Sequence, residues 1–165
     1  MRYDLSTLSL SEIMRIPLPP IPQQKKLIYR PSIEDAIHVY DALNQCIFDN
    51  QLTRPTIYLK PRCRKYWGLC YSDGELHDTG SYCEIRLMDK WYCVQWMVTI
   101  LAHEACHQAQ YDLDGIKREA AGKERIMSHG PSFFEYRERM NTFNIPLKTA
   151  YRQRKWMMIQ DLMKC

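Results

Sequence analysis

The segment from Trp91 to Tyr111 constrains the fold of this 165-residue chain more than any other stretch. Its first half is almost continuously apolar, and its second half contains His103-Glu104-Ala105-Cys106-His107. The apolar residues predict one long, half-buried helix that ends near Asp112–Gly115. Residues four apart advance a helix by about 400°, so the two imidazoles should lie one turn apart on the same face.

The two histidines and the glutamate of this HExxH pattern suit a metal ion. Two imidazole nitrogens one turn apart can hold one Zn²⁺ at about 2.0–2.1 Å. Glu104 is rotated by about 100° from His103, so it can reach a water on the metal more easily than it can act as a ligand. The pattern therefore predicts His103 and His107 as zinc ligands and Glu104 as a general base.

The residues alone leave the third ligand open. A catalytic zinc ion takes three protein ligands and keeps a fourth position free. The metzincin spacing would place a histidine six residues after His107, but that position is Leu113. His129 is one candidate, because Gly130 would let the backbone approach the metal helix and Pro131 would begin the next helix. A carboxylate is the alternative, from Glu119, Glu124 or Glu135.

The segments before this helix predict both α and β structure. Ser32 can cap a helix whose apolar residues follow helical spacing from Ile33 to Ile47. Three short β-like segments come next and are separated by Pro61 and by the turn-rich SDGELHDTGS. They predict a small antiparallel sheet formed by Thr56–Leu59, Tyr66–Tyr71 and Tyr82–Leu87.

Two further helices are expected after the metal helix. One begins at Pro131 and stops at Asn144-Ile145-Pro146, and the other is a basic, methionine-rich helix over residues 148–163. Five of the nine prolines lie in residues 1–31, which predicts an extended arm that is loose, or lies on this protein or on a partner. We therefore expect an α+β fold with three main helices, divided into 1–31, 32–147 and 148–165.

The pattern HExxH, a linker and then His129-Gly130-Pro131-Ser132-Phe133 resembles the SprT-like family of zinc metalloproteases, which includes the Spartan proteases. The upstream order is similar too, because a helix, a short β segment, Trp67-Gly68-Leu69-Cys70 and another strand precede the metal helix. The resemblance covers residues 33–145.

This resemblance implies a minimal zincin-like fold and peptide-bond hydrolysis, in some members on proteins crosslinked to DNA. It implies Glu104 as catalytic acid and base, with zinc held by His103, His107 and His129. Two features depart from the family. Many bacterial members carry a C-terminal zinc ribbon with paired cysteines, whereas this chain has Cys165 alone there, and residues 1–31 lie outside the family core.

The net charge of +4 is concentrated in residues 148–165, which hold five basic residues and one acidic residue. Basic residues interleaved with aromatic ones suit a polyanion, because phosphates bind the charges and bases stack on the rings. The apolar residues of the same segment would equally let it dock on the domain or on a partner. The candidate nucleic-acid contacts are Lys148, Arg152, Arg154 and Lys155.

Composition argues against a membrane protein, a secreted protein and a protein built on paired cysteines. Hydrophobic residues make up 45% and mean hydropathy is −0.48, and no run approaches the roughly 18 apolar residues of a membrane span. The N-terminus lacks the apolar core of a secretory signal. The seven cysteines include no CxxC pair, so we expect reduced thiols in a cytoplasmic protein, in the host cytoplasm if it is of phage origin.

A second hypothesis needs no catalysis. The same histidines could hold a structural zinc ion in an assembly component, for example of a phage particle, that docks through its N-terminal arm and C-terminal helix. An intact Glu104 favours the enzyme, because a structural site places no demand on that position. For an enzyme, the residue that stabilises the oxyanion stays open among Tyr111, Tyr136 and several arginines.

Overall fold

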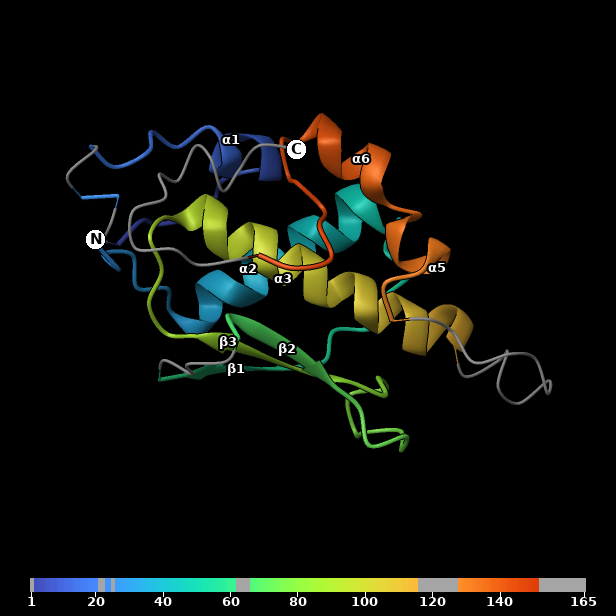
Figure 1. Cartoon of the computed structure of the whole chain (residues 1–165). Coiled ribbons are helices and arrows are strands. Elements are labelled where there is room, and N and C mark those ends of the chain that lie inside the picture. The colour runs from blue at the N-terminus through green and yellow to red at the C-terminus, as the bar shows by residue number, and fades with distance from the viewer. Residues whose placement is uncertain (1, 21–22, 25, 62–65, 116–127, 152–165) are drawn as a thin grey trace.

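Helices cover one face of a three-stranded sheet in the computed structural model, which describes residues 2–20, 23–24, 26–61, 66–115 and 128–151 (Figure 1). The central layer consists of α2 (Ile33–Ile47) and α3 (Val94–Ala109). The sheet lies on one side of this layer, and α1 (Leu10–Met14) and α6 (Arg137–Thr142) lie on the other. The expected α+β class is confirmed.

The helix α2 begins and ends where the sequence predicts. The Ser32 hydroxyl accepts a hydrogen bond from the Asp35 amide, and the Asp35 carboxylate accepts one from the Ser32 amide. This reciprocal cap satisfies two backbone donors that a helix start leaves unpaired. One face of α2 is buried in the core through Ala36, Val39, Tyr40, Leu43 and Ile47.

The sheet is mixed, so the prediction of an antiparallel sheet is wrong for one of its two pairs. Its strands are β1 (Thr56–Lys60), β2 (Gly68–Tyr71) and β3 (Glu84–Met88), in the order β1-β3-β2. β3 is antiparallel to β2 but parallel to β1. β1 and β2 follow each other in the sequence but do not pair with each other. β3 has the most buried side chains and takes the central position between them.

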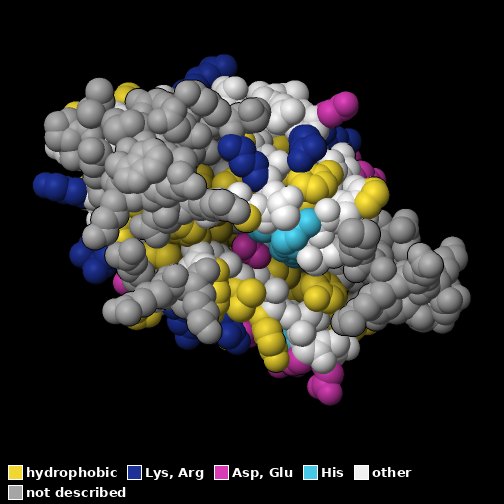
Figure 2. Space-filling view, in the orientation of Figure 1, with side chains coloured by type: hydrophobic (Ala, Val, Ile, Leu, Met, Phe, Trp, Pro, Cys, Tyr) yellow, Lys and Arg dark blue, Asp and Glu magenta, His cyan; other side chains and the backbone are white. Residues whose placement is uncertain are grey.

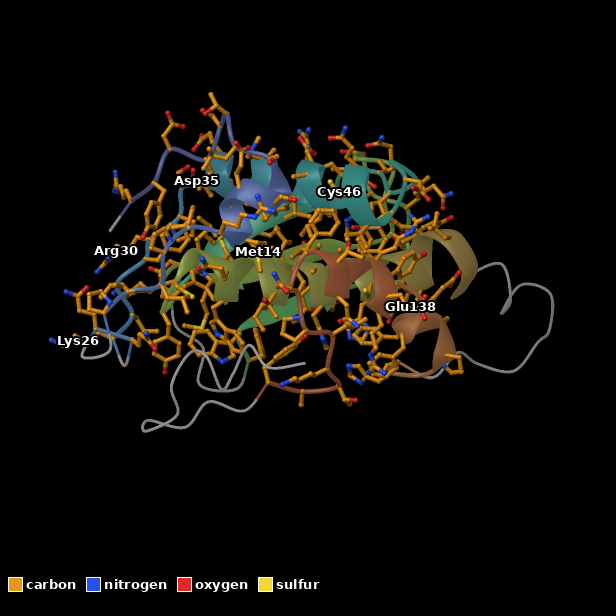
Figure 3. All side chains as sticks on the ribbon, turned by 90° about the horizontal axis from the view of Figure 1, so that it is seen from above. Met14, Lys26, Arg30, Asp35, Cys46 and Glu138 are labelled. Atoms are coloured by element: carbon orange, nitrogen blue, oxygen red, sulfur yellow. The ribbon has the colours of Figure 1, made fainter. Side chains whose placement is uncertain are left out.

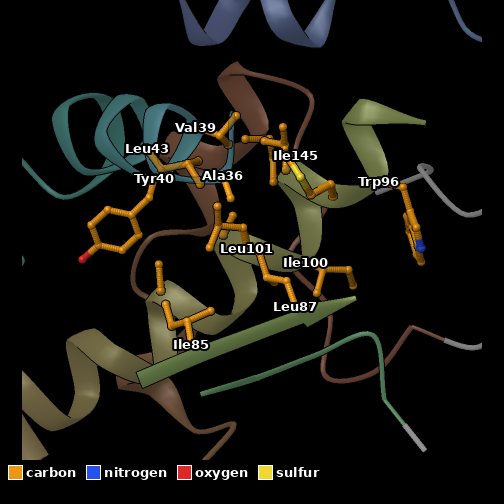
Figure 4. Close-up of a cluster of buried hydrophobic side chains, with 14 of the residues drawn as sticks. Ala36, Val39, Tyr40, Leu43, Ile85, Leu87, Trp96, Ile100, Leu101 and Ile145 are labelled. Atoms are coloured by element: carbon orange, nitrogen blue, oxygen red, sulfur yellow. The ribbon is translucent and has the colours of Figure 1, made fainter. Parts of the chain in front are cut away.

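The helix α3 is an interior helix rather than the half-buried one that we expected. Every residue from Val94 to Ala109 except His107 is buried. In Figure 4, Ile100 and Leu101 of α3 lie between β3, represented by Ile85 and Leu87, and the apolar face of α2. A helix covered on all sides is held by packing over its whole circumference, so its side chains are fixed in place.

The described part of the N-terminal segment lies on this protein and is not wholly extended. Ser9 and Glu12 form a reciprocal cap that begins α1, which the proline content did not predict. Figure 3, seen from above, shows α1 with Met14 over α2 and α3. The segment adds fully buried side chains to the core, including Leu5, Leu10, Ile13 and Tyr29.

The region after the metal helix differs from the prediction in two ways. The single helix expected from Pro131 is divided into α5 (Pro131–Phe134) and α6. The predicted helix over residues 148–163 does not begin at Lys148, since the described residues 148–151 are not helical. Its remainder lies outside the described residues. Tyr151 explains the non-helical start, because its hydroxyl bonds to Pro146 O and to the amide of Lys148.

The described residues also bear on membrane spans and on the state of the cysteines. Among them, no helix combines the length and apolar character that a membrane crossing requires. Five cysteines in this part of the chain are free thiols, and three of the five are buried: Cys83, Cys93 and Cys106.

Candidate metal centre

Three imidazole rings converge at the C-terminal half of α3. His103 and His107 lie one turn apart on this helix, and His129 lies just before α5. One nitrogen of each ring lies within 4.8 Å of the other two, and the Nε2 atoms of His103 and His129 are 3.5 Å apart. In a tetrahedral zinc site with bonds of about 2.0–2.1 Å, ligand nitrogens lie about 3.3 Å apart. These three histidines could therefore hold a metal ion.

Phe133 fixes the arrangement of the three rings. Its side chain is fully buried, and its ring centroid lies 4.8, 4.6 and 4.8 Å from those of His103, His107 and His129. Pro131 at the first helical position sets the direction in which α5 begins. The short helix therefore places Phe133 against α3 and holds the His129 ring close to those of the two helical histidines. Figure 2 shows histidine side chains, coloured cyan, at the surface near the centre of the view.

The environment keeps all three imidazoles neutral. Burial, with smaller effects of the other two histidines, lowers the pKa of His103 to about 3. Burial also lowers the pKa of His107 to about 4 and reduces the pKa of His129. Neutral imidazole is the form that binds metals, since a protonated ring has no lone pair to offer. The donor set is thus ready for a cation at neutral pH.

Glu104 lies beside this cluster with its carboxylate against strand β2. The side chain is 6% exposed, and Oε2 accepts a hydrogen bond of 2.7 Å from the backbone amide of Cys70. Burial raises the pKa of Glu104 to about 7, although the Cys70 amide acts in the opposite direction. A carboxyl group with a pKa near neutrality can both accept and release a proton under physiological conditions.

Gly68 lets β2 approach α3 closely enough for this contact. A Cβ atom at this position would lie 2.6 Å from Cγ2 of Ile100 and 3.1 Å from Cγ of Glu104. Both distances are shorter than an ordinary van der Waals contact. The glycine is therefore required by the packing of the strand on the helix, because any side chain would push β2 away from the carboxylate.

The C-terminal end of the described chain also borders the centre. Residues 146–151 cross α3 (Figure 1), and the Tyr151 ring lies 5.4 Å from both His103 and Trp96. Lys148 lies in this crossing segment, and its backbone raises the pKa of His103 slightly against the effect of burial. The other candidate nucleic-acid contacts, Arg152, Arg154 and Lys155, lie outside the described residues.

The alternative third ligands are not part of this cluster as far as the structure describes them. Glu135 is exposed and follows α5, and the described group of candidate metal ligands contains His129 instead. Leu113 packs against the core. Glu119 and Glu124 lie outside the described residues.

The other two histidines of the chain, and the two tyrosines considered for the oxyanion, have contacts outside this cluster. Nε2 of His38 bonds to the Leu8 carbonyl at 2.9 Å, and His77 bonds to Asp73 in an exposed loop. The Tyr136 ring packs on Phe48 at 4.6 Å, whereas Tyr111 is 42% exposed. Burial raises the pKa of the Cys106 thiol, as expected for a cysteine that fills space in the core.

The model of the SprT-like family matches residues 36–151, a stretch that contains the three histidines, Glu104 and Gly68. The chain belongs to the SprT-like family. This is a family of metallopeptidase-like domains, so the chain is a peptidase-like domain with a cluster able to hold a metal ion. The resemblance drawn from the residues is thereby confirmed. A comparison with curated proteins gave no match.

Gly68 and Phe133 belong to the motifs noted in the sequence, but the sequence alone predicts no role for either residue. A glycine between two β-forming residues is a signal of close backbone approach. What it approaches becomes visible only in three dimensions, where the partners are Ile100 and Glu104 of α3, more than thirty residues later in the chain.

We predict that Gly68→Ala lowers the free energy of unfolding by about 1–3 kcal/mol, because the new methyl group overlaps Ile100. In an Ile100→Ala background the same substitution should cost clearly less, since the closest overlapping atom is absent. Urea denaturation of the four proteins measures this coupling. Gly74→Ala is the control: its φ is +83° and no atom lies within 4 Å, so its cost should be equal in both backgrounds. Equal costs for Gly68→Ala in both backgrounds would contradict the packing argument.

Proposed function

We propose that this chain is a zinc-dependent metallopeptidase that hydrolyses peptide bonds, with Glu104 as the general base. One observation carries the proposal: three neutral, converging imidazoles lie next to a buried carboxyl group that is held by the backbone of β2. Membership of a metallopeptidase-like family supports it.

Zinc is the metal that best suits these donors. Three imidazole nitrogens are typical of zinc sites, whereas Mg²⁺ and Ca²⁺ prefer oxygen ligands. A catalytic zinc ion takes three protein ligands, and the described group of His103, His107 and His129 matches that number. A zinc ion held there supplies Lewis-acid chemistry, because it lowers the pKa of water to about 7 and polarises a carbonyl group.

Glu104 moves the proton in the proposed reaction. Its Oε2 atom is held by the Cys70 amide, so the carboxylate stays in a fixed position and Oε1 can take the proton of the attacking water. After attack on the peptide carbonyl, Glu104 returns this proton to the leaving amine. The pKa near 7 suits both halves of the cycle, since the group must first accept the proton and then release it.

The alternative function, a structural zinc ion in an assembly component, places the same histidines in a different role. In this alternative, the protein would dock to its partners through the N-terminal arm and the C-terminal helix. The described part of residues 1–31 contributes buried side chains to the core of this chain instead of standing away from it. A buried, hydrogen-bonded carboxyl group beside the histidines also has no purpose in a purely structural site.

A nucleic acid is the partner that we propose for the C-terminal segment, which would bring the peptidase to DNA-associated proteins. Lys148 lies on the segment that crosses α3 beside His103. A polyanion bound at Lys148 would therefore lie near the metal centre. The residues proposed to bind it are Lys148, Arg152, Arg154 and Lys155.

We expect the purified protein to bind about one zinc ion per chain. Replacement of His103, His107 or His129 by Ala should weaken binding by more than the roughly 10- to 100-fold typical of residues that only support a ligand. Competition with a chromophoric chelator measures the affinity, and His77→Ala, outside the cluster, is the matched control. Full zinc retention in His129→Ala together with its loss in Glu124→Ala would show that a carboxylate is the third ligand.

Glu104→Gln should keep zinc but lower the turnover of an unfolded protein substrate by about 10²- to 10⁴-fold, because the amide cannot accept the proton. Glu75→Gln, in an exposed loop, makes the same chemical change and should retain full activity. Turnover by Glu104→Gln equal to that of the parent would eliminate the proposed mechanism. A parent that binds zinc but hydrolyses no protein substrate would favour the structural alternative.

The nucleic-acid proposal predicts salt-sensitive DNA binding, with a slope of log K against log salt near −3.6 for about four phosphate contacts. Replacing Arg152, Arg154 and Lys155 by Gln should reduce that slope to about −0.9, since about one contact remains. The control replaces Arg2, Lys26 and Arg30 by Gln and so removes the same charge from the N-terminal segment. Absence of DNA binding by the parent, or equal losses in both variants, would exclude a specific role of the C-terminal segment.

A further inference from the structure

Gln110 connects the two segments that supply the three histidines. It is the first residue of η1 (Gln110–Gly115), where α3 continues as a π-helix, and it is only 6% exposed. Its Oε1 atom lies 3.1 Å from Nδ1 of His107. Its Nε2 atom donates a hydrogen bond of 2.9 Å to Oγ of Ser132 in α5. Ser132 directly precedes Phe133, the residue on which all three imidazoles pack.

The direction of the first hydrogen bond determines which nitrogen of His107 is available to a metal ion. The amide oxygen of Gln110 can only accept, so Nδ1 of His107 carries the proton and donates it. In a neutral imidazole the other nitrogen, Nε2, then has the free lone pair. If the amide were reversed, its NH₂ group would donate to Nδ1 and the proton would lie on Nε2, where it would prevent metal binding. Ser132 can act as donor or acceptor and therefore tolerates either partner atom.

The π-helical turn holds Gln110 in this position. Asp112, two residues later, accepts hydrogen bonds from the Ser81 hydroxyl at 2.7 Å and from the Tyr82 amide at 3.0 Å. It also accepts one of 2.9 Å from Gln108. These bonds anchor the end of the helix to the segment before β3. π-helical turns are rare and often occur at functional sites.

We propose that Gln110 is a positioning residue of the metal centre: it fixes the tautomer and orientation of His107 and connects α3 to the segment that carries His129. The inference rests on the proposed function, because it requires a metal ion bound by His107. Gln110 acts in this role through His107 and is not proposed to contact the metal or the substrate. Residues that hydrogen-bond a metal-binding imidazole in this way commonly change metal affinity by about 10- to 100-fold.

The test is the zinc dissociation constant of full-length variants, measured by chelator competition. Gln110→Leu should weaken zinc binding by about 10- to 100-fold, because Nδ1 loses its acceptor. Gln110→Glu should stay within about threefold of the parent, since a carboxylate accepts from both Nδ1 and the Ser132 hydroxyl. Ser132→Ala should have a smaller effect, of a few-fold, because Gln110 keeps its bond to His107. Gln51→Leu, an exposed glutamine after α2, is the matched control and should bind as the parent does.

A second measurement separates positioning from folding. The melting temperatures of the metal-free parent, Gln110→Leu and Gln110→Glu should be similar. A loss of zinc affinity in Gln110→Leu at an unchanged melting temperature cannot come from a folding defect. Zinc binding by Gln110→Leu as tight as that of the parent would overturn the inference, as would equal losses in Gln110→Leu and Gln110→Glu. A folded parent that binds no zinc would instead overturn the proposed function, before any variant is compared.

Discussion

The close contact between β2 and α3 at Gly68 is the constraint on which the rest of this centre depends. It brings the Cys70 amide to 2.7 Å from the Glu104 carboxylate, and it closes off that carboxylate from solvent. Burial then raises the pKa of Glu104, while the same interior helix lowers the pKa values of His103 and His107. One interior helix therefore carries the buried carboxyl group and two of the three neutral imidazoles.

Rigidity of the centre comes from the position of α3 inside the molecule. The helix is covered by the sheet on one side and by α1, α2 and α5 on others, so only His107 of its sixteen residues escapes full burial. Side chains in such closely packed interiors occupy low-energy rotamers and interdigitate with few voids. The third histidine lacks a helix of its own and relies on Phe133 and α5 instead. The N-terminal segment also covers α3, because α1 packs on it and buries Leu10 and Ile13. The proline content of this segment did not predict such packing.

Local signals in the sequence predicted what depends on local structure. The cap at Ser32, the bounds of α2 and the one-turn spacing of His103 and His107 all follow from interactions between residues three or four apart. Long-range pairing was beyond such signals. The parallel pairing of β1 with β3, the full burial of α3 and the bond between Gln110 and Ser132 each depend on elements distant in the chain. The resemblance to SprT-like proteins supplied His129, which spacing alone left among several candidates.

The central claim is that three histidines hold zinc, with an open position next to Glu104. A crystal structure of the zinc-loaded protein tests it most directly. The account predicts zinc bound by Nε2 of His103, His107 and His129, with a solvent molecule in the remaining position and within hydrogen-bonding distance of Glu104. A fourth protein side chain on the metal, or a Glu104 carboxylate out of reach of that position, would contradict the account.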